Sequence, residues 1–282
     1  MKVLNEHRIF GGVQRFYEHD SSVIGLPMRF SVYLPPQAEA GLVPAVMCLA
    51  GLTCNEETFM TKAGAQRAAA RLGLALIAPD TSPRGASVPG ESESWDFGVG
   101  AGFYLDATQK PWAHYWRMES YLIESLLPTL AACMPIDPLR LGILGHSMGG
   151  HGALMLALRH PSLFVSVSAL APICAPMQCP WGQKAFTNYL GEDRAQWVDH
   201  DATELMRKQS SVPYPQGILI DQGLADKFLA EQLHPHLFDE ACQAVGQPLT
   251  LRMHEGYDHG YYFISTFIEE HMGHHARGLS SG

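Results

Sequence analysis

The stretch that decides the fold of this chain is Leu141-Gly142-Ile143-Leu144-Gly145-His146-Ser147-Met148-Gly149-Gly150-His151-Gly152. It reads as a short apolar strand, then the pattern G-x-S-x-G, then an apolar segment of helical periodicity over residues 153–158. This order places a serine at the tip of a sharp strand-to-helix turn, and the small residues on either side let strand and helix approach closely. The N-terminus of the following helix stabilises developing negative charge. We therefore predict that Ser147 is a nucleophile.

The rest of the chain alternates short, β-branched apolar runs with longer segments of helical periodicity. Strands are expected at residues 30–34, 45–49, 75–79, 140–144, 165–170, 218–220 and 249–253. Helices are expected at residues 58–72, 115–132, 149–159, 229–245 and 261–275. This alternation predicts a mostly parallel central sheet flanked by helices on both faces, and with the nucleophile motif it predicts an α/β-hydrolase fold. Residues 80–112 and 172–213 break the alternation and carry many aromatics, so we expect two long functional segments.

A serine hydroxyl needs a base to take its proton, and in this fold the acid and then the histidine follow the nucleophile along the chain. His259 lies between the last expected strand and the last expected helix, so it should stand at the carboxyl edge of the sheet, where ligands bind. The alternatives are His254, which is expected within the strand, and three histidines of the last helix, expected on the surface: His271, His274 and His275.

Two aspartates near the expected strand 218–220 are candidates for the acid. Asp221 ends that strand and could cap a turn. Asp226 lies beyond the turn at Gly223, where a loop can bring its carboxylate to Nδ1 of His259 and hold the correct tautomer. Asp226 is the favoured choice, since Asp258 is too near His259 in sequence to reach its far nitrogen easily.

An oxyanion hole needs two backbone N–H groups that face the tetrahedral oxygen. One is expected from Met148, which follows the nucleophile. The second is expected from Leu52, just beyond Gly51 in the loop after an early strand.

Composition limits the class of partner and the compartment. The 282 residues are read as one catalytic domain, residues 1–282, with 46% hydrophobic and 17% charged residues. A formal net charge of −9 argues against nucleic acid or an anionic membrane surface as partner. We see no signal peptide and no apolar run of membrane-spanning length. The six cysteines show no CxxC spacing and are expected to be free thiols in the cytoplasm; neither a metal nor a cofactor is expected.

Motifs along nearly the whole chain resemble the S-formylglutathione hydrolase family, also called esterase D. They are Phe10-Gly11-Gly12, Gly51-Leu52-Thr53-Cys54, Ile77-Ala78-Pro79-Asp80-Thr81-Ser82-Pro83-Arg84-Gly85, Ser94-Trp95-Asp96-Phe97-Gly98, Gly100-Ala101-Gly102-Phe103-Tyr104, the nucleophile motif, Ala171-Pro172-Ile173-Cys174, Cys179-Pro180-Trp181-Gly182 and Glu255-Gly256-Tyr257-Asp258-His259.

The resemblance implies hydrolysis of the thioester S-formylglutathione to glutathione and formate, in formaldehyde detoxification. It implies the catalytic triad Ser147, Asp226 and His259, with oxyanion donors Leu52 and Met148. Trp95, Trp181 and Cys54 are candidates for substrate contacts, and Cys54 is either a sensitive thiol or a buried, inert one. The substrate is a small molecule, and a homodimer is compatible with the sequence. The alternative functions are a broad short-acyl carboxylesterase, acyl transfer to an alcohol, and a binding module without catalysis.

Overall fold

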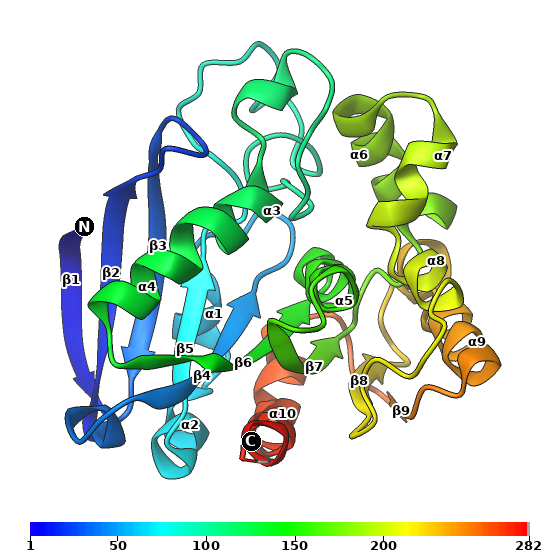
Figure 1. The fold of residues 1–282 in the computed structure, drawn as a ribbon. Coiled ribbons are helices and arrows are strands. Elements are labelled where there is room, and N and C mark those ends of the chain that lie inside the picture. The colour runs from blue at the N-terminus through cyan, green and yellow to red at the C-terminus, as the bar shows by residue number, and fades with distance from the viewer. Residues whose placement is uncertain (281–282) are drawn as a thin grey trace.

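A nine-stranded sheet forms the centre of the computed structural model, which describes residues 1–280 (Figure 1). Its order is β1-β2-β3-β5-β4-β6-β7-β8-β9. The first four strands in this order pair antiparallel, and those from β5 to β9 pair parallel. The strand bounds are β1 Lys2–Ile9, β2 Gly12–Asp20, β3 Pro27–Leu34, β4 Val43–Leu49, β5 Ala75–Pro79, β6 Ile136–His146, β7 Phe164–Leu170, β8 Ile218–Gly223 and β9 Leu249–His254.

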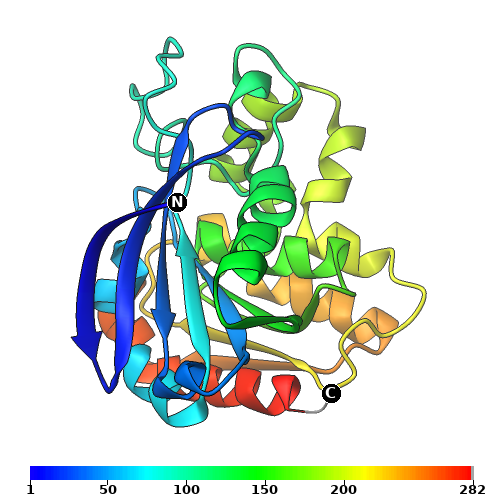
Figure 2. The ribbon, with the colours of Figure 1, turned by 60° about the vertical axis from the view of Figure 1, so that its left-hand side comes forward.

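Helices cover both faces of this sheet (Figures 1 and 2). Helices α2 and α10 pack together and contact the central strands from one face, while α4, α5, α8 and α9 lie against the other. The helix bounds are α1 Thr58–Lys62, α2 Gln66–Leu72, α3 Met118–Ser120, α4 Leu127–Cys133, α5 Met148–Arg159, α6 Pro180–Leu190, α7 Arg194–Trp197, α8 Ala202–Arg207, α9 Pro235–Val245 and α10 Tyr261–Leu279. The architecture confirms the predicted α/β-hydrolase fold.

All seven expected strands are present, but the sequence did not predict the hairpin of β1 and β2. Every residue of β1 except Ile9 is exposed, so this strand has no apolar alternation to detect. Two expected helices are interrupted. Residues 58–72 form α1 and α2, separated at Gly64, which has a φ of 72°. Residues 229–245 form a π-helical turn and then α9, separated at His234, which has a φ of 49°.

The two long segments lie beyond the carboxyl ends of the parallel strands (Figure 1). Residues 80–112 are irregular, and their aromatic side chains Phe103 and Tyr104 are fully buried. Residues 172–213 are not irregular, because they contain α6, α7 and α8. Both segments therefore build structure above the edge where the candidate nucleophile stands.

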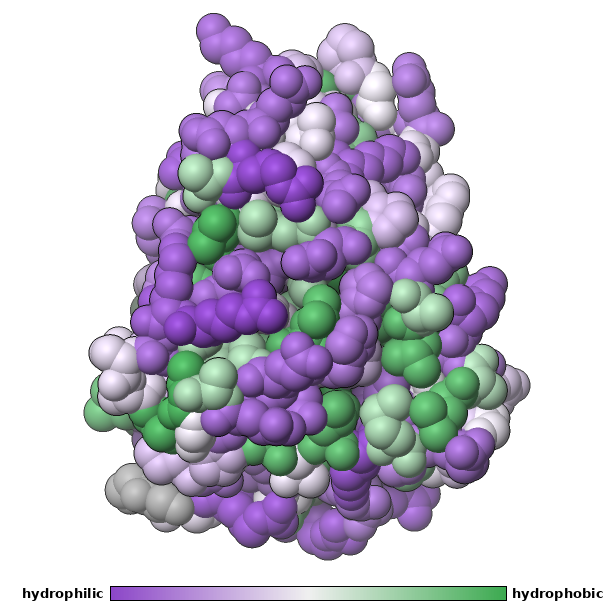
Figure 3. All heavy atoms as spheres, turned by 90° about the vertical axis from the view of Figure 1, so that its right-hand side faces the viewer, coloured by the Kyte–Doolittle hydropathy of each residue, from purple (hydrophilic) through white to green (hydrophobic). Residues whose placement is uncertain are grey.

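The face that carries β9 and α9 is hydrophilic over most of its area (Figure 3). Hydrophobic residues appear there in small separate groups. Among residues 1–280, none of the helices combines the length and apolar character that a membrane crossing requires.

Candidate active site

Ser147 stands at the turn between β6 and α5 in a strained backbone conformation, with φ 58° and ψ −118°. Its N–H donates to the carbonyl of Leu170 at 3.0 Å, which fixes the turn against β7. A Cβ at Gly145 would lie 1.8 Å from the carbonyl oxygen of Gly149, and one at Gly149 would lie 2.1 Å from that of Leu49. Larger residues therefore cannot occupy these two positions of the G-x-S-x-G pattern without moving the backbone.

His259 lies in the loop between β9 and α10, and its Nε2 is 2.9 Å from Oγ of Ser147. Its Nδ1 is 2.6 Å from Oδ2 of Asp226. Because a carboxylate only accepts, Nδ1 carries the hydrogen, and Nε2 accepts from the serine hydroxyl. The three side chains thus form one hydrogen-bonded line with the polarity that proton abstraction from serine requires.

Asp226 follows β8 and is held in place by two further donors. The N–H of Phe228 donates to Oδ1 at 2.8 Å, and Nε2 of Gln222 donates to Oδ2 at 3.2 Å. Burial alone would raise the pKa of Asp226, but the bonds from His259, Phe228 and Gln222 outweigh it, so the pKa lies below its ordinary value. The carboxylate is therefore ionised at neutral pH. Sequence reasoning did not find Gln222, although it lies beside both candidate aspartates.

The other candidate acid, Asp221, lies apart from His259 in a separate buried network. It accepts from Arg252, from Nε2 of His254 at 2.9 Å and from Nε2 of His271 at 2.9 Å. Burial raises the pKa of Asp221, but these donors reverse the effect and hold it well below its ordinary value. Its contacts thus belong to the packing of β8, β9 and α10.

The expectation that the histidines of the last helix lie on the surface is wrong. His271 and His275 are completely buried, and His274 is partly buried with its Nε2 3.1 Å from the carbonyl of Val167. The reason is that α10 packs against β7, whose Ser166 and Ser168 supply hydroxyl partners for the imidazoles.

The two expected oxyanion donors lie next to the nucleophile. Met148 is the first residue of α5, so its N–H has no intrahelical acceptor. In the loop after β4, the N–H of Thr53 donates to Gly100 and that of Cys54 to Gly51. Within residues 1–280 we find no protein acceptor for the N–H of Leu52, which leaves it able to bind an external oxygen.

A row of aromatic side chains in mutual contact extends from the protein surface to His259. The ring of Trp95, 56% exposed, is 5.6 Å from the buried ring of Trp181, which is 4.7 Å from that of Phe228. Phe228 in turn stands edge-to-face with His259 at 5.0 Å. The structure thus brings both expected tryptophans to one wall and adds Phe228, which sequence reasoning missed although it lies two residues beyond Asp226.

Cys54 is partly buried beside the loop that carries Leu52. Burial raises the pKa of its thiol, although neighbours that include Thr58 and Tyr261 oppose the shift. Since the thiolate is the reactive form, this environment favours the inert alternative over the sensitive one.

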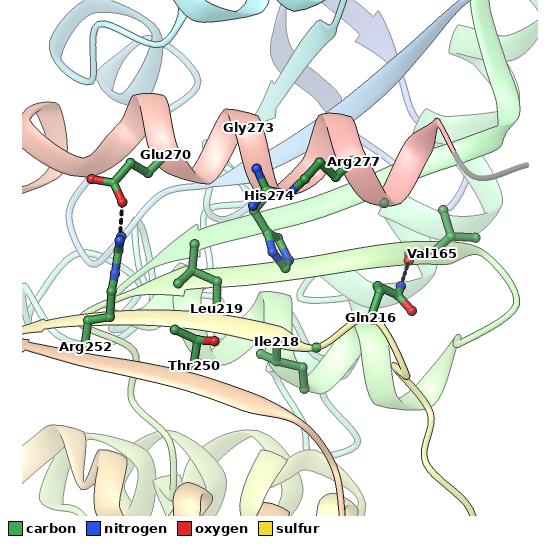
Figure 4. Close-up of a pocket in the computed structure, with 12 residues that line it drawn as sticks. Val165, Gln216, Ile218, Leu219, Thr250, Arg252, Glu270, Gly273, His274 and Arg277 are labelled. Atoms are coloured by element: carbon green, nitrogen blue, oxygen red, sulfur yellow. Dashed lines mark hydrogen bonds and ion pairs between the residues drawn. The ribbon is translucent and has the colours of Figure 1, made fainter.

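A hollow of about 770 Å³ lies elsewhere, between the first residues of β8 and β9 and the C-terminal half of α10 (Figure 4). Arg252 pairs there with Glu270, and Gln216 donates to the carbonyl of Val165. Ligands of such sheets bind at the carboxyl ends of the strands, whereas this hollow lies toward the amino ends of β7 and β8. Over the described residues, no group of three or more His, Cys, Asp or Glu side chains could hold a metal ion.

Comparisons with known proteins show the family to which this chain belongs. The putative esterase family matches residues 21–274. The chain is 52% identical over 282 residues to S-formylglutathione hydrolase of Mus musculus, covering 100% of this chain and 99% of that protein. It is 52% identical over 274 residues to S-formylglutathione hydrolase of Arabidopsis thaliana, covering 96% and 95%. A solved S-formylglutathione hydrolase from Agrobacterium tumefaciens superimposes with a TM-score of 0.96 at 46% identity, covering 99% of this chain and 100% of that one. The chain belongs to the S-formylglutathione hydrolase family.

Proposed function

We propose that this protein hydrolyses S-formylglutathione to glutathione and formate, with Ser147 as nucleophile, His259 as base and Asp226 as the acid that orients it. The observation that carries the proposal is the hydrogen-bonded line from Asp226 through His259 to Ser147, with bonds of 2.6 and 2.9 Å. Membership of the family supplies the substrate.

The reaction proceeds through an acyl-enzyme. Oγ of Ser147 attacks the formyl carbon while its proton passes to Nε2 of His259. The tetrahedral intermediate collapses, the carbon–sulfur bond breaks, and His259 returns the proton to the departing sulfur of glutathione. Water then attacks the formyl ester and gives a proton to His259, and collapse releases formic acid and restores Ser147. The N–H groups of Leu52 and Met148 stabilise the oxyanion in both steps.

We propose that the glutathione moiety lies along the wall of Trp95, Trp181 and Phe228. This wall ends at the base, so a thioester bound along it would present its acyl carbon to Ser147. Glutathione carries carboxylates, and a chain of net charge −9 needs local positive charge to bind it. Lys227 is exposed, and its ammonium group lies 4.8 Å from the centre of the Phe228 ring, so it would supply that charge.

We further propose a role in formaldehyde detoxification in the cytoplasm, by one catalytic domain that uses no cofactor. The six cysteines are all free, as is usual in a reducing compartment, and one continuous sheet runs through the chain. We also propose that the protein forms a homodimer and, because of its negative charge, does not bind nucleic acid.

The test is to assay the purified protein on S-formylglutathione beside p-nitrophenyl acetate, together with the Ser147→Ala variant. We expect S-formylglutathione to be the better substrate, and the variant to lose roughly 10⁴-fold or more in kcat with an unchanged circular dichroism spectrum. A clear preference for the simple ester would favour the broad carboxylesterase alternative. Normal turnover by a folded Ser147→Ala variant would exclude Ser147 as nucleophile.

A further inference from the structure

The side chain of His146 takes no part in the chemistry proposed above, yet it lies beside the base and directly precedes the nucleophile in the chain. It is the last residue of β6, directly before Ser147, and is 6% exposed. The centre of its ring is 4.6 Å from that of His259 and 5.9 Å from that of Tyr261. Burying the two ring nitrogens costs free energy that an apolar residue in the same volume would not cost. The presence of an imidazole at this position therefore needs a separate physical explanation.

The hydrogen bonding of His146 fixes its tautomer. Nε2 is 3.0 Å from the backbone carbonyl oxygen of His259. A carbonyl only accepts, so Nε2 carries the hydrogen, and Nδ1 is an acceptor that is buried with no partner within residues 1–280. Burial lowers the pKa of His146 to about 3, so the ring stays neutral, in this tautomer, at neutral pH.

The bond from His146 ties the loop of the base to the strand of the nucleophile. On its other side the loop is tied to the acid, since the N–H groups of Leu224 and Ala225 donate to the carbonyls of His254 and Tyr257, both at 2.9 Å. Because His146 is joined covalently to Ser147, its bond to the His259 carbonyl relates the two backbones directly. A Cβ at Gly51 would lie 3.2 Å from Nδ1, so the ring also packs against the loop that carries Leu52.

We infer that His146 is a positioning residue, which sets the approach of His259 to Ser147 by holding the backbone carbonyl of the base. The inference rests on the proposed function, since His146 acts only through His259. A displacement of the order of 1 Å at a reacting group can lower a rate by about 10²-fold, so loss of one such tether is measurable.

Three substitutions separate the hydrogen bond from the volume of the ring. His146→Phe keeps a ring and removes the donor. His146→Gln places an amide N–H about where Nε2 stands, whereas the amide of His146→Asn reaches only the position of Nδ1. We expect kcat to fall about 10- to 100-fold in the Phe and Asn variants, with KM for p-nitrophenyl acetate changed less than about twofold. His146→Gln should recover most of the loss.

A second readout is the rate at which a fluorophosphonate labels Ser147. That reaction also needs the serine proton removed, so its rate should fall in parallel with kcat. A role in folding alone would lower the melting temperature without this change. If His146→Phe does not fold, the pair of polar variants, Asn and Gln, still makes the comparison.

His151 supplies the matched control. It is also buried, its Nε2 is 3.2 Å from a backbone carbonyl, that of Phe103, and its Nδ1 has no partner within residues 1–280. Phe103 lies outside the proposed machinery, so we expect His151→Phe to lower the melting temperature and leave kcat within about twofold of wild type at a temperature where the variant is folded.

Equal kcat in His146→Asn and His146→Gln would overturn the inference, as would an equal loss in His151→Phe. A wild-type protein that neither hydrolyses esters nor reacts with the fluorophosphonate would overturn the proposed function and this inference with it. Full activity of a folded His146→Asn variant would overturn the inference alone.

Discussion

Replacement by asparagine is expected to have different effects at two aspartates five residues apart: loss of kcat at Asp226 and loss of stability at Asp221. In Asp226→Asn the amide keeps the shape of the carboxylate but no longer holds the Nδ1 hydrogen of His259. We expect kcat to fall about 10⁴-fold, because the base is then stabilised in the wrong tautomer. At about 1.36 kcal/mol for each factor of ten, the loss is about 5.4 kcal/mol of transition-state stabilisation. The fold should change little, since the amide oxygen can still accept from the N–H of Phe228 and only the 3.2 Å bond from Gln222 to the second oxygen is lost.

Asp221→Asn should instead destabilise the fold. It removes the negative charge that faces Arg252, His254 and His271, and Asp221 is completely buried. Removing one partner of a buried ion pair costs about 3–5 kcal/mol. With an unfolding entropy of about 2.1 cal/mol/K per residue over 282 residues, the melting temperature should fall by about 5–8 °C. The kcat of the folded variant should stay within about threefold of wild type, because Asp221 does not contact the triad and asparagine, which has the same shape, leaves β8, β9 and α10 in place once the variant is folded.

Both variants would be compared by steady-state kinetics at 25 °C and by thermal unfolding followed by circular dichroism. The expected result is a crossed pattern, in which one variant loses kcat and the other loses melting temperature. A slower Asp221→Asn than Asp226→Asn would show that the acid has been misassigned. A loss of kcat of the same size in both would show that the two carboxylates are not functionally separate.

Three further outcomes are expected. Burial lowers the pKa of His146 and His151 to about 3 and of His274 to about 4, from an ordinary value of 6.5. Below pH 6.5 the unfolded chain therefore binds more protons than the folded one, and the melting temperature should fall steadily from pH 6.5 toward pH 4; a constant value would contradict the burial of neutral imidazoles. If the acyl pocket is closed around formyl, kcat/KM should fall steeply from formyl through acetyl to butyryl thioesters of glutathione, and a flat or rising series would refute the formyl assignment. Lys227→Gln should raise KM for S-formylglutathione about threefold or more and leave that for p-nitrophenyl acetate unchanged, and equal effects on both substrates would exclude Lys227 from glutathione recognition.

The proposed triad could be derived from sequence because each of its residues follows a recognisable strand. The G-x-S-x-G pattern marks the end of β6, and the chain order of nucleophile, acid and histidine directs attention to the ends of β8 and β9. The same logic could not reveal Phe228 or His146, because their contacts join segments that are distant in the chain.

The spacing of the histidines along the last helix could have indicated that they are buried, although their polarity suggested a surface position. His271 and His275 are four residues apart, so they share one face of α10, and Ile264 and Ile268 continue that face toward the start of the helix. Their partners Ser166 and Ser168 alternate on β7 with the period of a strand, so they share one face of the sheet. By contrast, β1 is exposed on both sides, so no pattern of burial could have predicted it.

The hydrogen bonds that link β7, α10 and Asp221 all donate in the same direction along one chain of side chains. The hydroxyl of Ser166 donates to Nδ1 of His275, whose Nε2 donates to Ser168; that hydroxyl donates to Nδ1 of His271, whose Nε2 donates to Asp221. Each imidazole thus uses both nitrogens while remaining neutral, so only the carboxylate at the end carries charge, and Arg252 balances it.

This network explains how the fold holds His259 in place from outside the active site. His259 lies between β9 and α10, so its position depends on how those two elements are fixed to the sheet. Asp221 joins them, because on β8 it bonds to Arg252 and His254 of β9 and to His271 of α10. The next residue, Gln222, donates to Asp226. Since side chains alternate along a strand, Asp221 and Gln222 point to opposite faces of β8. On one face of β8, Asp221 therefore joins the two elements that flank His259. On the other face, Gln222 holds Asp226, the acid that orients His259.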